Sequence, residues 1–262
     1  MVLPTLDAHA HIDPARNPDT LLECGVVLAM TLSLDEAEQS VKRHDMNIAW
    51  GTGCHPRFPR AQEGFDAKRF RSLAERMATI GEVGLDTGSR VPLEMQRKTF
   101  RQVLEIAAGL PRLVSIHSFQ ATGLVLKELE RCPVSVPVLH EWFGNVAETK
   151  KAVELGCYFS IHSQVARNSK FRLHVPPERI LLESDHGEKD PPAAIPCRVE
   201  WVEYLVAQQY DRDVIEIRRL AWKNLGRIIR ATNTSHLFPN ALVAFCAKAE
   251  QTGLASSKKE NL

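Results

Sequence analysis

The stretch ATIGEVGLD (78–86) is a short apolar run that ends in acidic residues. A run of this kind, bounded by polar residues, predicts a buried strand. Residues 69–78 and 94–110, which flank the run, place apolar side chains three and four positions apart, as amphipathic helices do. A buried strand between two such helices predicts one unit of a parallel α/β sheet.

The same pattern continues in both directions along the chain, and further helical periodicity covers residues 122–132 and 145–156. Eight strands that alternate with helices predict closure into a (β/α)8 TIM barrel, for which this length is common. An open doubly wound sheet is the alternative, although no GxGxxG or GxxxxGK[ST] motif follows any run. The other seven predicted strands lie within residues 2–10, 25–33, 47–56, 112–118, 135–142, 156–163 and 179–185.

We expect a single TIM-barrel domain over residues 1–249. After the last strand come a proline-rich connection (189–196) and two segments with helical periodicity, 198–210 and 214–231. The final stretch, 250–262, is polar and is predicted to be a disordered tail.

The composition excludes some classes of protein. With 33 Lys and Arg against 32 Asp and Glu, the chain lacks the basic excess of a protein that coats nucleic acid, so any polyanion must be held locally. The six cysteines form no CxxC pair, which is typical of reduced thiols in a cytoplasmic protein. Neither a secretory signal nor an apolar stretch long enough to span a bilayer is visible, so no membrane association is expected.

Polar residues with ligand chemistry stand where the predicted strands end. In a parallel barrel all the carboxyl ends of the strands open on one face, so these residues are expected to meet in one cup. Side chains two positions apart on a strand point to the same side, which allows the first two histidines to bind one ion together. The six candidates are His9, His11, Glu82, His117, His140 and Asp185.

Imidazole and carboxylate ligands suit zinc, manganese, iron or nickel, and a site richer in oxygen also admits magnesium. Six ligands exceed the number that one tetrahedral ion uses. Two divalent ions about 3.5–4 Å apart, bridged by a carboxylate and by a water with a lowered pKa, are the economical interpretation, with Glu82 as the bridge. Each residue could instead be an ordinary core or capping residue, but this alternative has to hold for all six residues at once. The identity of the metal (Zn, Mg or Mn) stays open.

The order of these motifs resembles the TatD family of metal-dependent hydrolases, which belong to the amidohydrolase-like barrels. The resemblance implies that His9, His11 and Asp185 hold one ion, that His117 and His140 hold the other, and that Glu82 joins them. It further implies that Asp185 orients or deprotonates the attacking water, which makes Asp185 and Glu82 the catalytic pair. The motifs are DAHAHID (7–13), GCHP (53–56), GEVGLD (81–86), SIHS (115–118), LHEWFG (139–144), LGCYFSI (155–161), VPPERILLESD (175–185) and NLGRII (224–229).

The resemblance extends to residues around the ligands. It implies that His55 and Asp86 lie behind the ligands and orient them, and that Gln96 is a packing or capping residue. Two positions depart from the family pattern: Phe119 stands where an arginine usually follows IHS, and SDHGEKDPP (184–192) replaces a TDAPY-like run. The short chain is most similar to the TatD-like QatD branch of the Qat anti-phage systems.

Basic residues near the expected open face are candidates for substrate binding. Arg57 and Arg60 follow the third strand, and Arg167, Lys170 and Arg172 follow the seventh. Charge-assisted hydrogen bonds from such side chains position phosphate oxygens, although an ordinary solvated face would look the same in sequence. Trp142 and Phe143 could stack on a base or could simply close one end of the barrel.

The leading hypothesis is a two-metal DNase or phosphodiesterase with DNA as its substrate, with partner proteins from a defence cassette. A second hypothesis keeps the metals and changes the bond to an amide, an ester or an aminoacyl-tRNA linkage, which Phe119 and the balanced net charge permit. A third hypothesis is a non-catalytic scaffold subunit of a defence complex.

Overall fold

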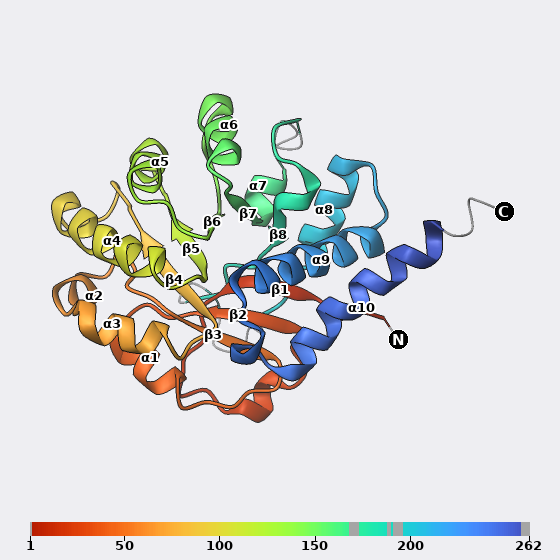
Figure 1. Cartoon of the computed structure of the whole chain (residues 1–262), viewed down its shortest axis with the longest axis horizontal. Coiled ribbons are helices and arrows are strands. Elements are labelled where there is room, and N and C mark those ends of the chain that lie inside the picture. The colour runs from red at the N-terminus through yellow and green to blue at the C-terminus, as the bar shows by residue number, and fades with distance from the viewer. Residues whose placement is uncertain (1, 168–172, 188–189, 191–195, 258–262) are drawn as a thin grey trace.

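The computed structural model describes residues 2–167, 173–187, 190 and 196–257, and its eight parallel strands curl into a barrel with helices outside (Figure 1). The strands are hydrogen bonded in sequence order, from β1 to β8. Each of the eight predicted runs contains one strand, which confirms the predicted (β/α)8 fold. The strands are β1 (Leu6–Ala10), β2 (Val26–Met30), β3 (Ile48–Thr52), β4 (Thr79–Gly84), β5 (Leu113–His117), β6 (Val136–His140), β7 (Tyr158–Ile161) and β8 (Ile180–Leu182).

The helices cover the outer face of the barrel. The six predicted helical segments correspond to α3, α4, α5, α6, α8 and α9, with ends that differ by a few residues. Short 3-10 helices η1 (Pro18–Leu21), η3 (Pro177–Arg179) and η4 (Ser235–Leu237) lie in the connections. The α-helices are α1 (Leu34–Ser40), α2 (Pro59–Glu63), α3 (Ala67–Ala74), α4 (Leu93–Ala108), α5 (Thr122–Arg131), α6 (Val146–Glu154), α7 (Ser163–Ala166), α8 (Glu200–Tyr210), α9 (Val214–Thr232) and α10 (Asn240–Ser257).

The C-terminal helix does not follow the predicted division of the chain at residue 250. α10 runs to Ser257, so the start of the predicted tail lies inside a helix. The physical reason is packing: Leu242, Cys246 and Ala249 are buried, and Glu250 pairs with Arg230 of α9. Residues 258–262 of the predicted tail lie outside the described part of the chain.

Backbone hydrogen bonds bring the two ends of the sheet together. The N–H of Asp185 donates to the carbonyl of His9 at 3.1 Å, and the N–H of His11 donates to the carbonyl of His186 at 2.6 Å. Below them the buried carboxylate of Asp7 accepts from the N–H and the hydroxyl of Ser184. The nearly closed barrel is therefore joined along β1 and the segment after β8, which is where three of the predicted ligands lie.

Two irregularities in strand register coincide with predicted ligands. The β1–β2 pairing shifts between Asp7 and Ala10, around His9, and the β4–β5 pairing shifts between Ile80 and Val83, around Glu82. Such bulges re-aim side chains near functional sites. Gly84 lies so close to β5 that an added Cβ would be 2.1 Å from the carbonyl oxygen of His117, so only glycine allows this approach.

Large apolar side chains fill the space between strands and helices, among them Phe70, Phe100, Phe159 and Trp222. All six cysteines are free thiols. In the described part of the chain, none of the helices combines the length and the apolar character that crossing a bilayer requires.

Candidate metal centre

The structure brings the six predicted ligand residues together at the carboxyl end of the barrel. Glu82, at the end of β4, lies in the middle with 1% of its side chain exposed. Its Oε2 atom is 3.0 Å from His11 Nε2 and 3.3 Å from His9 Nε2. Its Oε1 atom is 2.5 Å from His117 Nδ1 and 3.2 Å from His140 Nε2. Oε1 therefore faces the imidazoles of His117 and His140, and Oε2 faces those of His9 and His11, with a third imidazole, that of His55, 3.2 Å away.

Four overlapping groups of described residues have ligand atoms within 4.8 Å of one another. Two of them consist of predicted ligands only: His9, His11 and Asp185 form one group, and Glu82, His117 and His140 form the other. The remaining two groups include a residue that was not predicted as a ligand: they are His11, His55 and Glu82, and His9, His140 and Glu183. Asp185 completes the first group from the segment after β8, with its Oδ1 atom 3.8 Å from the Nε2 atoms of both His9 and His11.

The outer ring nitrogens of three of these histidines face hydrogen-bond acceptors. His11 Nδ1 is 3.0 Å from the carbonyl of Met30, His117 Nε2 is 3.1 Å from Asp86 Oδ2, and His140 Nδ1 is 3.2 Å from Glu183 Oε1. A carbonyl or carboxylate only accepts, so each of these outer nitrogens can carry a proton, and with a cation at the centre the inner nitrogen would be the one that offers its lone pair. His9 Nδ1 lies 2.7 Å from the hydroxyl of Ser115, which is compatible with the same arrangement.

The buried donor set fits divalent cations. Among the described residues, Glu82 Oε2 has no hydrogen-bond partner of good geometry, although imidazole nitrogens surround it at 3.0–3.3 Å. The Nε2 atoms of His9 and His11 also approach each other to 3.3 Å. Lone pairs and a carboxylate oxygen at these distances repel one another unless a cation or shared protons lie between them, and imidazole with carboxylate is a preferred ligand set for several divalent metals.

Mutual electrostatics shift the pKa values of these groups in opposite directions. Burial alone would raise the pKa of Glu82, but His55, His140 and His117 lower it well below its ordinary range. Burial lowers the pKa of His9, with a further contribution from neighbouring His140. The pKa of His140 is raised despite its burial, because Glu183 and Glu82 flank it. Strongly perturbed groups at one location are typical of a functional site.

Asp185 has an unusual backbone conformation. Its φ of 50° lies in the left-handed region, which is uncommon for residues other than glycine. Burial raises the pKa of its carboxyl, while 32% of its side chain remains exposed. Strained residues of this kind occur disproportionately at active sites. Asp185 is thus both part of the donor set and accessible to solvent.

Two polar residues of the site were missed in the sequence. Glu183 is fully buried, with its Oε1 atom accepting from the N–H of Glu141 at 2.9 Å and facing His140. Ser115 contacts His9. Glu183 stands two positions before Asp185, and Ser115 two positions before His117. Because side chains at such spacing share one face of an extended strand, the alternation that paired His9 with His11 could have found Ser115, which lies with His117 in β5. Glu183 and Asp185 follow the end of β8, so this alternation does not extend to Glu183.

The two residues expected behind the ligands differ in their contacts. Asp86 accepts a hydrogen bond from His117 and is held by Gln96, whose Oε1 accepts from the Asp86 N–H at 2.8 Å. Gln96 is buried and also donates to the carbonyls of Asp86 and Val91, in line with a packing role. His55 reaches further inward, with its Nε2 atom 3.2 Å from Glu82 Oε2. Burial lowers the pKa of His55 to about 4.

The predicted substrate-binding residues are only partly brought to the site. Arg57 lies beside it, with Nε 3.4 Å from Asp86 Oδ2 and half of the side chain exposed. Arg60 lies in α2, and Arg167 follows α7, both of them exposed. Lys170 and Arg172 lie outside the described residues.

The two neighbouring aromatic residues after β6 have different environments. Trp142 is buried and donates to Thr149 Oγ1 at 2.9 Å, so it closes the barrel end. Phe143 is 52% exposed, as a base-stacking residue would have to be.

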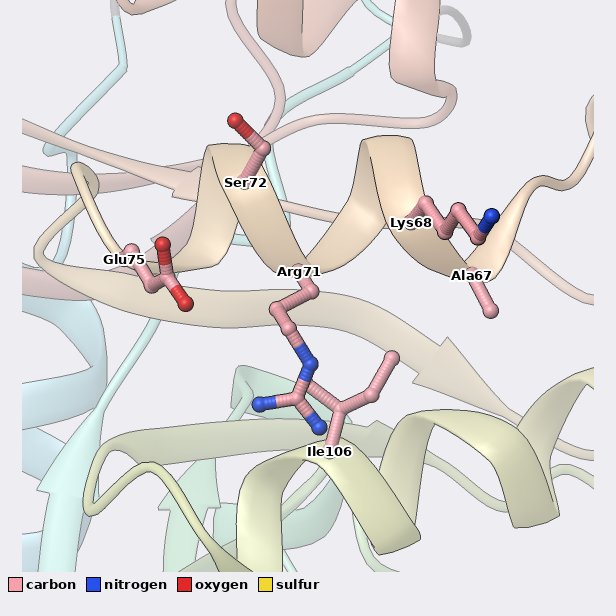
Figure 2. Close-up of a pocket in the computed structure, with 6 residues that line it drawn as sticks. All are labelled: Ala67, Lys68, Arg71, Ser72, Glu75 and Ile106. Carbon is pink, nitrogen blue, oxygen red and sulfur yellow. The ribbon is translucent and has the colours of Figure 1, made fainter.

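A further surface pocket lies outside this centre, between α3 and α4. Figure 2 shows Arg71 of α3 extending toward Ile106 of α4 across it. None of the candidate ligands lines this pocket, so it plays no part in the metal centre. The lining residues are Ala67, Lys68, Arg71, Ser72, Glu75 and Ile106.

Comparisons with known proteins identify a family. The model of the family described as TatD related DNase matches residues 6–230. The tatdn3 protein of Danio rerio, whose name describes a candidate deoxyribonuclease, is 26% identical over 124 residues, which are 44% of this chain. The match spans 47% of that relative, about half of its length.

Two solved structures are similar in fold. The TatD homologue YjjV of Escherichia coli K12 superposes with a TM-score of 0.72 at 20% identity, over 88% of this chain and 98% of that one. A TatD family hydrolase of Entamoeba histolytica gives a TM-score of 0.72 at 13% identity, over 87% and 98% of the two chains.

Proposed function

The chain belongs to the TatD-related DNase family, whose members are metal-dependent hydrolases, and we propose that it hydrolyses phosphodiester bonds of DNA at the site around Glu82. The observation that carries the proposal is the pair of buried donor groups on the two oxygens of one carboxylate. Two adjacent cation sites are a recurring arrangement in enzymes that cleave phosphate esters.

The proposed ligands are those of the two groups. His9, His11 and Asp185 would hold one ion, His117 and His140 would hold the other, and Glu82 would contact both. Divalent ions bound here would supply Lewis-acid chemistry, by polarising a phosphoryl oxygen and making a water molecule more acidic. Glu183 and Asp86 would keep His140 and His117 in the orientation that presents their inner lone pairs.

Asp185 is the proposed general base. Its carboxylate is more accessible to solvent than that of Glu82, so it can contact a water molecule that approaches the centre from outside. We assign to it the proton of the attacking water. The guanidinium of Arg57, fixed at one side by Asp86, would bind a phosphate oxygen of the DNA strand.

The biological setting is proposed on the sequence resemblance alone. The resemblance of the GEVGLDTGSR turn (81–90) and the LHEWFGN segment (139–145) favours a role in an anti-phage cassette with partner proteins, and the reduced thiols favour a cytoplasmic location.

The test is hydrolysis of single-stranded and duplex oligonucleotides by chelator-treated protein, with Mg²⁺, Mn²⁺ or Zn²⁺ added back. Asp185→Asn is expected to lower kcat by about 10²–10³-fold, as loss of a general base does. Asp211→Asn is the matched control, because Asp211 has nearly the same backbone φ of 51° at the end of α8, away from the site. Failure to cleave DNA with any of these metals would contradict the proposal.

One observation favours a second candidate, a metal-dependent hydrolase of acyl esters or aminoacyl-tRNA. Phe119, which directly follows the segment of His117, is 46% exposed and offers no charge to a phosphate. Parallel assays on p-nitrophenyl phosphodiesters and acyl esters separate the two candidates. Cleavage of the acyl esters alone would replace the DNase proposal with this one.

A further inference from the structure

Five imidazoles surround the carboxylate of Glu82. His55 differs from His11, His117 and His140 in the hydrogen-bond partner of its outer nitrogen. A histidine binds a cation through an unprotonated nitrogen, so its other nitrogen carries the proton and donates it to an acceptor. His11, His117 and His140 meet this condition, because their outer nitrogens face a carbonyl or a carboxylate.

The outer nitrogen of His55 has the opposite partner. The backbone N–H of Arg57 donates to His55 Nδ1 at 3.1 Å. A ring nitrogen that accepts a hydrogen bond carries no proton, so the proton of the neutral ring is on Nε2. That atom lies 3.2 Å from Glu82 Oε2. His55 therefore presents an N–H to the centre, whereas His11, His117 and His140 each have an acceptor on the outer nitrogen, which leaves the inner nitrogen available for a cation.

The surrounding chain holds the His55 ring in this orientation. The side-chain amide of Gln62 donates to the carbonyls of Cys54 and His55, which fixes the loop after β3. The ring of Phe58 packs edge-on against the imidazole, with centroids 5.0 Å apart. Only 8% of the His55 side chain is exposed. A buried N–H with a fixed direction is the kind of donor that stabilises developing negative charge without reorganisation.

We propose that His55 is not a metal ligand and that its Nε2–H donates a hydrogen bond to a phosphoryl oxygen of the substrate. The identity of the substrate oxygen rests on the proposed function. Arg57, two residues along, has a half-exposed guanidinium beside Asp86, so one short loop offers a neutral donor and a cation on the same side of the centre. An anionic tetrahedral oxygen group is the ligand class that uses both.

The role predicts a moderate effect of substitution, without loss of metal. Removing one fixed donor to a developing anion costs about 10²–10³-fold in kcat in other hydrolases. His55→Gln keeps an N–H close to the position of Nε2, whereas His55→Ala removes it. Gln is therefore expected to restore part of the rate that Ala loses.

The first measurement is metal content per chain, with inorganic phosphate binding to the metal-loaded protein measured by calorimetry. His55→Ala and His55→Gln are expected to retain the wild-type number of metal equivalents, whereas His11→Ala loses metal. Phosphate affinity is expected to fall about tenfold in His55→Ala and less in His55→Gln. Loss of a metal equivalent in both His55 variants, unchanged phosphate affinity in His55→Ala, or absence of phosphate binding by the wild type would overturn the proposal.

The second measurement reads the proton directly. Long-range ¹H–¹⁵N spectra of the metal-loaded protein are expected to show His55 as the Nε2–H tautomer with an unprotonated Nδ1. A metal-shifted Nε2 resonance for His55 would overturn the proposal. Neither measurement depends on nuclease activity, so a protein that passes both and cleaves no DNA would contradict the proposed function alone.

Discussion

Glu82 and Glu128 are both buried carboxylates enclosed by basic side chains, but only Glu128 has both oxygens satisfied. On α5, Glu128 accepts from Arg101 at 2.7 and 2.9 Å, from Arg97 at 3.1 Å and from Arg131 at 3.1 Å. At the end of β4, Glu82 Oε2 has no hydrogen bond of good geometry from the described residues, despite three imidazole nitrogens nearby.

The difference follows from the chemistry of the two bases. A guanidinium is always protonated and only donates, so the Glu128 cluster is complete when the chain folds. An imidazole can present a lone pair instead, and hydrogen bonds to its outer nitrogen determine whether it does. A cluster of histidines around a carboxylate therefore indicates a cation site when the outer nitrogens face acceptors. A cluster of arginines around a carboxylate indicates a structural ion network.

The largest expected difference between Glu82 and Glu128 is in turnover, when the same substitution is made at both carboxylates. Glu82→Gln is expected to lower turnover at least 10³-fold, about 4 kcal/mol in the activation barrier, because both ion groups lose their shared ligand. Glu128→Gln is expected to leave kcat/KM within about twofold, since Glu128 lies in α5 on the outer face of the barrel. Steady-state kinetics on one substrate check both variants. Equal losses would mean that the two clusters do not differ in function.

Removing metal should affect only the cluster around Glu82. Ligand at about 100 times its Kd stabilises a protein by about 2.7 kcal/mol, so chelation is expected to lower Tm by roughly 5–10 °C. In Glu82→Gln the chelator should change Tm little, while in Glu128→Gln the full decrease should remain. Calorimetric scans with and without chelator test this. A wild-type Tm that is insensitive to chelator would argue against bound metal.

Measurements of the free energy of unfolding should show an effect at the Glu128 cluster. Glu128→Gln is expected to lower the free energy of unfolding by about 2 kcal/mol, because it leaves three guanidinium groups close together without their carboxylate. Denaturant titration of chelator-treated protein gives this value. As a control, Glu130→Gln alters an exposed carboxylate that pairs with Lys151 and should cost less than about 1 kcal/mol.

The smallest expected effect is the pH dependence of the stability difference between the wild type and Glu128→Gln. Arg101, with Arg97, lowers the pKa of Glu128 from 4.5 to about 2, against the opposing effect of burial. A carboxyl with a lowered folded-state pKa contributes stability that is fully present above pH 4.5 and is lost as the pH falls toward 2. The wild-type advantage over Glu128→Gln should therefore shrink by roughly 1–2 kcal/mol between pH 5 and pH 2.5. Urea titrations at the two pH values measure it, and a constant difference would rule out the ion network as its source.

Much of the fold was predictable because its signals are local. Eight apolar runs, among them 78–86 and 112–118, contain the eight strands, and the six proposed ligands were singled out because each is a polar residue within or just after a run. The helical end of the chain was not found, since the burial of Leu242 and Cys246 depends on the packing of α10 against α9. Glu183 escaped detection as well, because its function is visible only through His140, which is 43 residues away.

Residues close together in the chain predict the pattern of strands and helices, the residue types available as ligands and their place near strand ends, because burial and side-chain alternation act over a few residues. They do not predict which nitrogen of each imidazole faces the centre. That choice depends on acceptors such as the carbonyl of Met30 and the carboxylate of Glu183, and on the N–H of Arg57, which folding brings against the rings. These partners determine which ring nitrogen of each histidine carries the proton, and they surround the rings only in the folded barrel.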